Sequence, residues 1–298
     1  MFRRRRRRER RPALIVRLVR RWGWNPGRVA SEVLEWVEVL VVAGALAALV
    51  MTFVTVRMHV PTGSMIPTID PRDSFFVDRI SYYFRDPKPG DIVVFYHTDA
   101  LAVRSVVPGS PADVAGITPG TRIKFINQIP VADGGEGIVA TLPEETHVYL
   151  IALQKTDGGQ YAHRTFSLGP TTPAMDSLGP FGLTTSEKRL RYVKRLIAVG
   201  GQTVQIRGGG VYVDGERLEG PRFDREYTVS NDARMRYGVV PTLVPEGKWF
   251  VLGDNSSDSL DSRYWGFADE RDFIGEPYLR VWPLSRFGAM NGYFGSAP

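Results

Sequence analysis

The sequence predicts a mainly β protein that follows a single membrane-spanning helix near its N-terminus. Residues 39–56, VLVVAGALAALVMTFVTV, carry no charge. At about 1.5 Å per residue, a helix of that length spans roughly 27 Å, close to the thickness of the bilayer core. Beyond Arg57, short runs of β-branched and aromatic residues alternate with Gly, Pro and Asp. That alternation is typical of strands separated by turns.

We expect the membrane-spanning helix to cover residues 33–56. There are two alternatives: a buried helix of a soluble protein, and a cleavable signal peptide. The length of the uncharged run argues against both. Residues 1–32 form an arginine-rich arm, with twelve Arg against Glu9 and Glu32 and a net charge of +10. Positive charge on the N-terminal side predicts that this arm stays in the cytoplasm and that everything after Arg57 lies outside.

The distribution of charge argues against nucleic acid as a partner. The whole chain of 298 residues carries +6, so residues 33–298 carry −4 once the arm is set aside. An acidic remainder offers no basic groove for nucleic acid. The basic arm instead favours contact with the membrane and its anionic lipids. The chain has no cysteine, which excludes a Cys nucleophile, a disulfide scaffold and thiolate metal sites.

Beyond the membrane we expect mostly strands. The Asp214-Gly215 pair between two apolar runs predicts a hairpin turn. Short helices are expected over 110–116 and 186–192, and the Pro/Gly/Thr-rich stretch 169–185 predicts a linker beside a separate module within 98–173. The expected strands are 91–96, 122–126, 147–153, 204–206, 211–213 and 249–252.

Three segments point to serine chemistry outside the membrane. Ser64 lies in VPTGSMIPTI, a tight Gly-Ser turn stiffened by two prolines. Lys194 lies in YVKRLIAVGGQTV, where burial would favour the neutral amine and make it a usable base. The pattern alone fits a solvated strand lysine better. The third segment, LGDNSSDSLDSRYWGF at 252–267, suits a loop held by its own polar side chains, with Asp261 and Arg263 as a charge-assisted pair.

The histidines support no competing chemistry. None lies in a G-x-S-x-G turn, in an H-E-x-x-H helix or in a metal-ligand pair, so neither a Ser-His-Asp triad nor a zinc site is predicted. The four are His59, His97, His147 and His163.

Four segments in this order resemble bacterial type I signal peptidase, a membrane-anchored Ser-Lys endopeptidase of the S26 type. They are VPTGSMIPTI, KPGDIVVF at 88–95, YVKRLIAVGGQTV and GDNSSDSLDSRYWG at 253–266. The resemblance covers residues 33–96 and 187–285. It implies an antiparallel β-sheet catalytic domain after the membrane helix, in the bacterial cell membrane, with pre-proteins that carry signal peptides as substrates. It implies no metal and no organic cofactor.

The resemblance also assigns roles to individual residues. It implies that Ser64 is the nucleophile, that Lys194 is its neutral general base and that Ser259 hydrogen-bonds and orients the lysine. The oxyanion hole is expected from the Ser64 N–H and the hydroxyl of Thr62, where many relatives carry Ser. The remaining expected site residues are Asp261 and Arg263 as a supporting ion pair, Asp254 and Asn255 as the loop framework, and Val60, Met65 and Ile66 around shallow pockets for small substrate side chains.

A second resemblance lies between the peptidase segments. Residues 105–131, SVVPGSPADVAGITPGTRIKFINQIPV, resemble the core of a PDZ domain, and 147–155 and 161–168 would supply later strands. We therefore expect an inserted α+β PDZ-like domain over 97–175, a linker over 176–186, and a peptidase domain made of 57–96 and 187–298. PDZ folds bind extended peptides at a sheet edge. The Gly-rich carboxylate loop is not found before Ala102, so peptide binding, partner binding and a purely structural role stay open.

Two alternatives compete with the protease. One is a membrane-anchored PDZ-type adaptor whose peptidase part is inactive, against which the intact set of Ser64, Lys194 and Ser259 argues. The other is a self-cleaving Ser-Lys repressor. It requires a DNA-binding module, and the N-terminus offers only an arginine arm and a membrane span.

Overall fold

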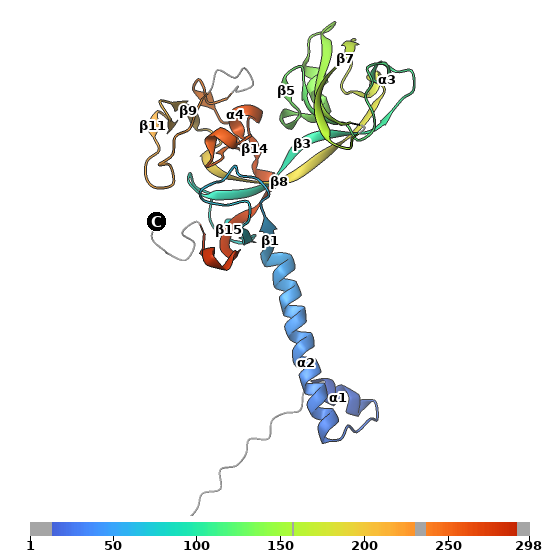
Figure 1. Ribbon diagram of the computed structural model, residues 1–298. Coiled ribbons are helices and arrows are strands. Elements are labelled where there is room, and N and C mark those ends of the chain that lie inside the picture. The colour runs from blue at the N-terminus through green and yellow to red at the C-terminus, as the bar shows by residue number, and fades with distance from the viewer. Residues whose placement is uncertain (1–13, 157, 230–236, 291–298) are drawn as a thin grey trace, which may run out of the picture. The chain divides into compact units, whose positions relative to one another are not determined.

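The computed structural model describes all residues except 1–13, 157, 230–236 and 291–298. The chain divides into two compact units, residues 1–56 and 57–298. The described part of the first unit is mainly helical, and the second is built mainly from antiparallel strands (Figure 1). The mainly antiparallel β fold expected after an apolar N-terminal helix is therefore confirmed.

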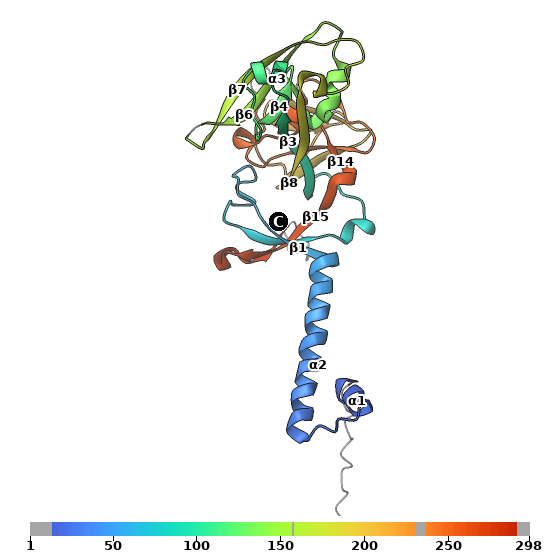
Figure 2. The same cartoon turned by 90° about the vertical axis from the view of Figure 1, so that its right-hand side faces the viewer.

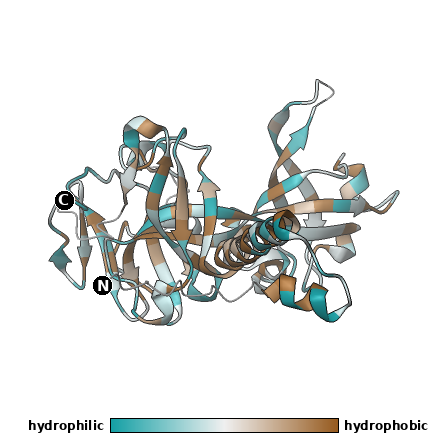
Figure 3. Ribbon diagram, turned by 90° about the horizontal axis from the view of Figure 1, so that it is seen from below, coloured by the Kyte–Doolittle hydropathy of each residue, from teal (hydrophilic) through white to brown (hydrophobic). Residues whose placement is uncertain are grey.

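The first unit contains α1 (Leu14–Arg21) and α2 (Arg28–Leu49), which continues as a π-helical turn over Val50–Val54. Residues 28–54 form one helix that is long and apolar enough to cross a membrane. None of the α2 side chains is buried by protein, and apolar residues cover most of its length in the end-on view of Figure 3. The helix ends two residues before the expected limit at 56, because Thr55 and Val56 already belong to a strand.

Two long strands organise the second unit. β3 (Ile92–Val106) pairs antiparallel along its whole length with residues 183–195 of β8 (Leu183–Val199), and the two strands lie side by side in both Figure 1 and Figure 2. At the end of the pair near Ile92 and Arg195 the sheet continues through β15 (Phe273–Trp282), β2 (Ser74–Asp78) and β1 (Thr55–His59). At the other end it continues through β4 (Arg122–Ile126), β6 (His147–Lys155) and β7 (Tyr161–Pro170).

The remaining elements complete the two ends. A smaller four-stranded sheet has the order β11-β10-β9-β12. Its hairpin turn is Asp214-Gly215, and both residues have positive φ, as a two-residue hairpin loop requires. The bounds are β9 Thr203–Arg207, β10 Gly210–Val213, β11 Glu216–Arg217, β12 Thr242–Leu243, β13 Lys248–Leu252, β14 Ala268–Asp269, β5 Ile129–Pro130, β16 Gly288–Ala289, α3 Pro111–Val114 and α4 Ser262–Trp265.

The inserted segment has its own hydrophobic core, formed by residues from Leu101 to Leu183. Strand runs at 122–126 and 147–155 appear where the sequence predicts them. Ser110 caps α3 by accepting a hydrogen bond from the Asp113 N–H, so the short helix near 110–116 is also confirmed.

Two expectations about the return from the insertion are wrong. The stretch 176–186 is not a simple linker, because Leu178, Phe181 and Leu183 are buried in the core of the insertion. Residues 186–192 form part of β8 and not a helix. Pairing with β3 decides this conformation, because main-chain bonds to a neighbouring strand override a weak local helix preference.

Candidate active site

Ser64 lies in a turn shortly after β1. The Ile66 N–H donates to Gly63 O at 3.1 Å and the Ile69 N–H donates to Met65 O at 2.9 Å, so the turn is closed by its own backbone. Met65 is fully buried and anchors the turn in the core. A Cβ at position 63 would approach Asp258 Oδ2 and Ile66 Cδ1 to 3.2 Å, so both side chains would have to shift by a few tenths of an ångström.

Lys194 lies on β8 and reaches the same point. Its Nζ is 2.7 Å from Ser64 Oγ, in a hydrogen bond that the ammonium donates and that the neutral amine can accept. Both side chains are buried, with exposures of 6% for Ser64 and 4% for Lys194. Burial lowers the pKa of Lys194 to about 8, against the opposing charge of Asp261. β8 therefore places beside Ser64 a lysine that loses its proton far more easily than a lysine in water.

The loop after β13 holds the backbone of the serine turn. The Asn255 N–H donates to Ser64 O at 3.0 Å, and Asn255 Nδ2 donates to Gly63 O at 3.1 Å. A trans peptide unit points its N–H opposite to its C=O. Fixing Gly63 O therefore also fixes the direction of the Ser64 N–H, which donates to no other residue that the structure describes.

The ion pair in this loop forms as a bidentate contact. Arg263 Nε and Nη2 donate to the two Asp261 carboxylate oxygens at 2.8 and 2.9 Å, and both side chains are almost completely buried. Asp261 Oδ2 also accepts from the Gly253 N–H at 3.0 Å. Arg263 Nη1 and Nη2 donate to Ser256 Oγ and O. These bonds leave the loop little freedom beside Ser64.

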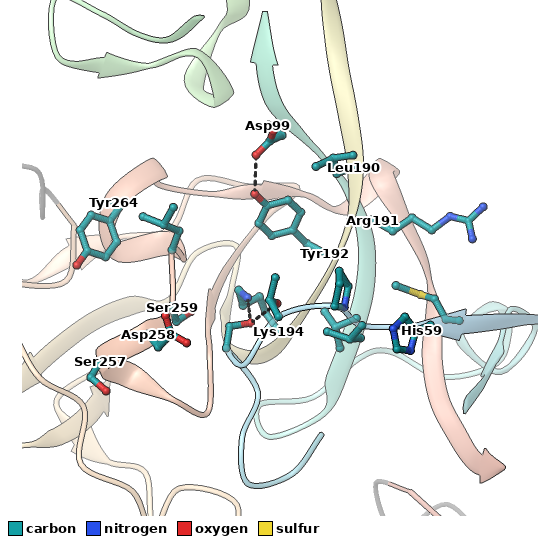
Figure 4. Close-up of a pocket in the computed structure, with 17 residues that line it drawn as sticks. His59, Asp99, Leu190, Arg191, Tyr192, Lys194, Ser257, Asp258, Ser259 and Tyr264 are labelled. Carbon is teal, nitrogen blue, oxygen red and sulfur yellow. Dashed lines mark hydrogen bonds between the residues drawn. The ribbon is translucent and has the colours of Figure 1, made fainter. Parts of the chain in front are cut away.

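A pocket of about 500 Å³ opens beside the Ser64–Lys194 pair (Figure 4). Val60 contributes to its wall as expected, whereas Met65 and Ile66 do not. Met65 cannot line the pocket because its side chain is fully buried in the core. The Ile66 side chain is 40% exposed but lies outside the pocket lining. The lining residues come from the end of β1 and the turn after it (58–62 and Ser64), from β3 (Asp99), from β8 (190–194), and from the loop and α4 (257–260 and Tyr264).

Comparison with known proteins identifies the family. The profile of the family described as "Signal peptidase, peptidase S26" matches residues 33–282. The chain belongs to this family. The expectation drawn from the four motifs is thereby confirmed, and the chain is a serine endopeptidase of the signal peptidase type.

Several relatives align along most of their length. Signal peptidase I of Leptolyngbya laminosa is 24% identical over 260 residues, which cover 87% of this chain and 85% of that protein. A probable signal peptidase I-1 of Synechocystis is 27% identical over 259 residues, covering 87% of each chain. Signal peptidase I of Mycobacterium tuberculosis is 26% identical over 287 residues, covering 87% of this chain and 76% of that protein.

Two further residues, Thr62 and Ser259, have roles implied by the signal peptidase resemblance, and both line the pocket. Thr62 Oγ1 lies 3.5 Å from Ser64 Oγ, in the wall of the same pocket. Ser259 lines the pocket, but its buried Oγ has no hydrogen-bond partner among the described residues. The structure therefore does not show the expected hydrogen bond between Ser259 and Lys194, whose Nζ donates to Ser64 Oγ.

Sequence reasoning missed the partner of Asp254. Arg195 follows Lys194 on β8, and its Nε and Nη2 donate to the two Asp254 oxygens at 2.7 and 2.6 Å. Both side chains are buried. Successive residues of a strand point to opposite faces. Two adjacent basic residues in an apolar strand could therefore have indicated that each has its own polar partner, one on each face. On one face of β8, Lys194 contacts Ser64. On the other face, Arg195 binds Asp254 and so holds the loop after β13 in place.

Tyr192 is a second missed residue. It is two positions before Lys194 and therefore on the same face of β8, where it forms part of the pocket wall. Its OH donates to Asp99 Oδ1 at 3.0 Å, as Figure 4 shows, and Lys124 Nζ donates to the same oxygen at 2.7 Å. Lys124 lies on β4, so a strand of the insertion helps to position the pocket wall.

A metal centre finds no support in the described residues, in which no group of three or more His, Asp or Glu side chains is arranged to hold a metal ion. His97, the most buried histidine of the four, packs 4.0 Å from the Trp265 ring, measured between ring centroids. Burial lowers the pKa of His97 to about 3, so it stays neutral and acts as a packing residue.

Proposed function

We propose that this signal peptidase cleaves signal peptides from exported pre-proteins with Ser64 as nucleophile and Lys194 as general base. The observation that carries the proposal is the 2.7 Å contact between Ser64 Oγ and a buried Lys194 Nζ whose pKa is lowered to about 8. A buried amine of that pKa is partly neutral near pH 7 and can accept the proton of a hydroxyl at hydrogen-bond distance.

The steps follow from these positions. Ser64 Oγ attacks the scissile carbonyl carbon, and its proton passes to Lys194 Nζ. The carbonyl oxygen becomes an oxyanion, for which the Ser64 N–H and the Thr62 hydroxyl are the available donors. The C–N bond then breaks as Lys194 returns the proton to the leaving amine. In the second half, neutral Lys194 takes a proton from the water that attacks the acyl carbon. The bond between that carbon and Ser64 Oγ then breaks, and Lys194 returns the proton to Ser64 Oγ, so that both residues regain their starting states.

The supporting residues act through the backbone. Asn255 positions the peptide unit between Gly63 and Ser64. Asp261 and Arg263 position the loop that carries Asn255 and Ser259. Val60 contributes to the pocket that receives the substrate side chains next to the scissile bond.

We also propose a single-pass topology and a domain plan. In this plan residues 1–32 are a cytoplasmic arm that includes the first residues of α2. The rest of the helix, through residue 54, crosses the cell membrane, and the peptidase and its insertion are extracytoplasmic. The support is the apolar helix of the first unit and the arginine excess before it. The peptidase domain comprises 57–96 and 187–298. The PDZ-like insertion begins near 97 and extends through the buried Leu183.

The test is cleavage of one purified pre-protein by the full chain in detergent. Wild type should release the mature chain, and Ser64→Ala and Lys194→Ala should each lower the rate at least a thousandfold, as removal of a nucleophile or its base does. Lys155→Ala changes an exposed lysine of β6, outside the pocket and the pair, and is the matched control. Equal cleavage rates in Ser64→Ala and wild type would exclude this mechanism. No cleavage by wild type, together with peptide binding by the insertion, would instead favour the adaptor hypothesis.

A further inference from the structure

The strand that carries Lys194 has a free edge. β8 pairs with β3 over residues 183–195, but on its other side it pairs with β13 only over Arg195–Val199. Within the part of the chain that the structure describes, no backbone group of residues 184–193 bonds on the side away from β3. This segment therefore exposes a row of main-chain donors and acceptors.

The bonds at the two ends of β8 show which residues face that edge. The Leu196 N–H donates to Asp91 O, and Leu196 O accepts from the Gly90 N–H, so residue 196 faces β3. At the other end Gly182 O accepts from Val107 N and also faces β3. Main-chain groups alternate between the two sides of an antiparallel strand, and the irregularities in the pairing fall on β3. The odd-numbered residues from 185 to 193 thus face the free edge.

This edge begins in the active-site pocket. Residues 190–194 of β8 line the pocket next to Ser64, and the labelled side chains of Leu190, Arg191, Tyr192 and Lys194 follow one another along the strand in Figure 4. From Val193 back to Thr185 the strand covers about 27 Å at about 3.3 Å per residue. The same edge therefore leads without interruption from the pocket into the insertion.

We propose that the pre-protein chain continues from the active-site pocket along this edge and pairs with residues 185–191 as an added strand. The inference rests on the proposed function, because the occupant is the substrate of that site. Pairing at a strand edge uses main-chain bonds, which accept segments of many sequences. The insertion would thus extend the substrate-binding surface beyond the residues next to the scissile bond.

Two observations favour the passing substrate over other occupants. The exposed Glu187, Arg189 and Arg191 place charges along the edge, which opposes pairing with the edge of a second copy. The backbone N–H groups of residues 181–183, in the turn before β8, are not free to bind a terminal carboxylate. The Phe181 and Leu183 N–H groups both donate to Leu178 O, and the Gly182 N–H donates to Gly179 O. A chain that runs through fits this edge better than one that ends there.

The test compares peptide substrates of different length. One peptide fills only the pocket, and two others add eight residues on either the signal side or the mature side of the scissile bond. With wild type, one extension should raise kcat/KM about tenfold, the equivalent of one or two main-chain hydrogen bonds. Replacing alternate amides of that extension by esters should remove most of the gain, because esters lack the N–H donor.

A variant pair tests the protein side of the contact. Glu187→Pro removes one N–H from the free edge, where proline is tolerated in strands, and should bring the long-to-short ratio of kcat/KM close to one. Glu187→Ala removes only the side chain and should keep the wild-type ratio. Equal kcat/KM for all three amide peptides, or an undiminished gain with the ester peptides, would overturn the inference. Failure to cleave even the short peptide would instead overturn the proposed function.

Discussion

Replacing Asn255 by leucine tests how the oxyanion donor is positioned. Asn255 Nδ2 donates to Gly63 O at 3.1 Å and so directs the Ser64 N–H. Leucine has a similar shape and no donor, whereas the backbone bond from residue 255 to Ser64 O is kept. Losing the side-chain bond alone is worth about 1 kcal/mol, or roughly fivefold. Losing a whole oxyanion donor costs about 100- to 1000-fold in kcat.

We therefore expect Asn255→Leu to lower kcat about 10- to 100-fold, between these two limits, with little change in KM. Steady-state cleavage of a peptide substrate measures this. Ser257→Ala is the control, because Ser257 Oγ donates to Asn255 Oδ1 and its removal leaves the Gly63 contact in place. The pH at which activity is half-maximal should not move, since Lys194 is untouched. A kcat within twofold of wild type would refute the positioning role.

The remaining predictions concern the base, the loop and the buried ion pair. Activity should rise with pH up to about 8 and then level off, because Lys194, with its pKa lowered to about 8, must lose its proton to act as base; a flat pH–rate profile from acid to alkaline pH would contradict this. Gly253→Ala should lower both kcat and the melting temperature, because the new Cβ would approach Ser259 Oγ to 2.2 Å and the backbone Ser64 O to 2.6 Å and would force the buried turn to shift. Wild-type kcat would show that the loop can move aside without disturbing the site. Arg195→Met should destabilise the protein by about 3 to 5 kcal/mol, because it leaves Asp254 buried with weaker compensation. Thermal melting measures that loss, and an unchanged melting temperature would argue against a structural role for the pair.

Local sequence was sufficient for the strands and turns. The alternating runs at 122–126 and 147–153 form strands, and Asp214-Gly215 forms the hairpin turn, because these features depend on side-chain branching and on residues that accept positive φ. The helix expected over 186–192 was wrong because its conformation depends on β3, which lies about ninety positions earlier in the chain. Long-range pairing is invisible to a local pattern.

The candidate site shows the same division. The motif around Ser64 and the lysine in an apolar strand are visible in the sequence, and so is the polar loop that carries Asn255. Their mutual distances are not, because positions 64 and 194 come together only through the register of β3 and β8. Lys194 and Arg195 illustrate the limit. Alternation predicts that they face opposite sides, but not that one side holds Ser64 and the other Asp254.

The sequence by itself determined the family, the apolar helix and the residue types available for chemistry, because each of these is carried by short contiguous motifs or by composition. Only the tertiary structure decided which donors meet which acceptors, since burial and distance depend on chain segments far apart in sequence. The buried Lys194 acquires its lowered pKa in this way. The free edge of β8 likewise exists only because β13 stops pairing at Arg195.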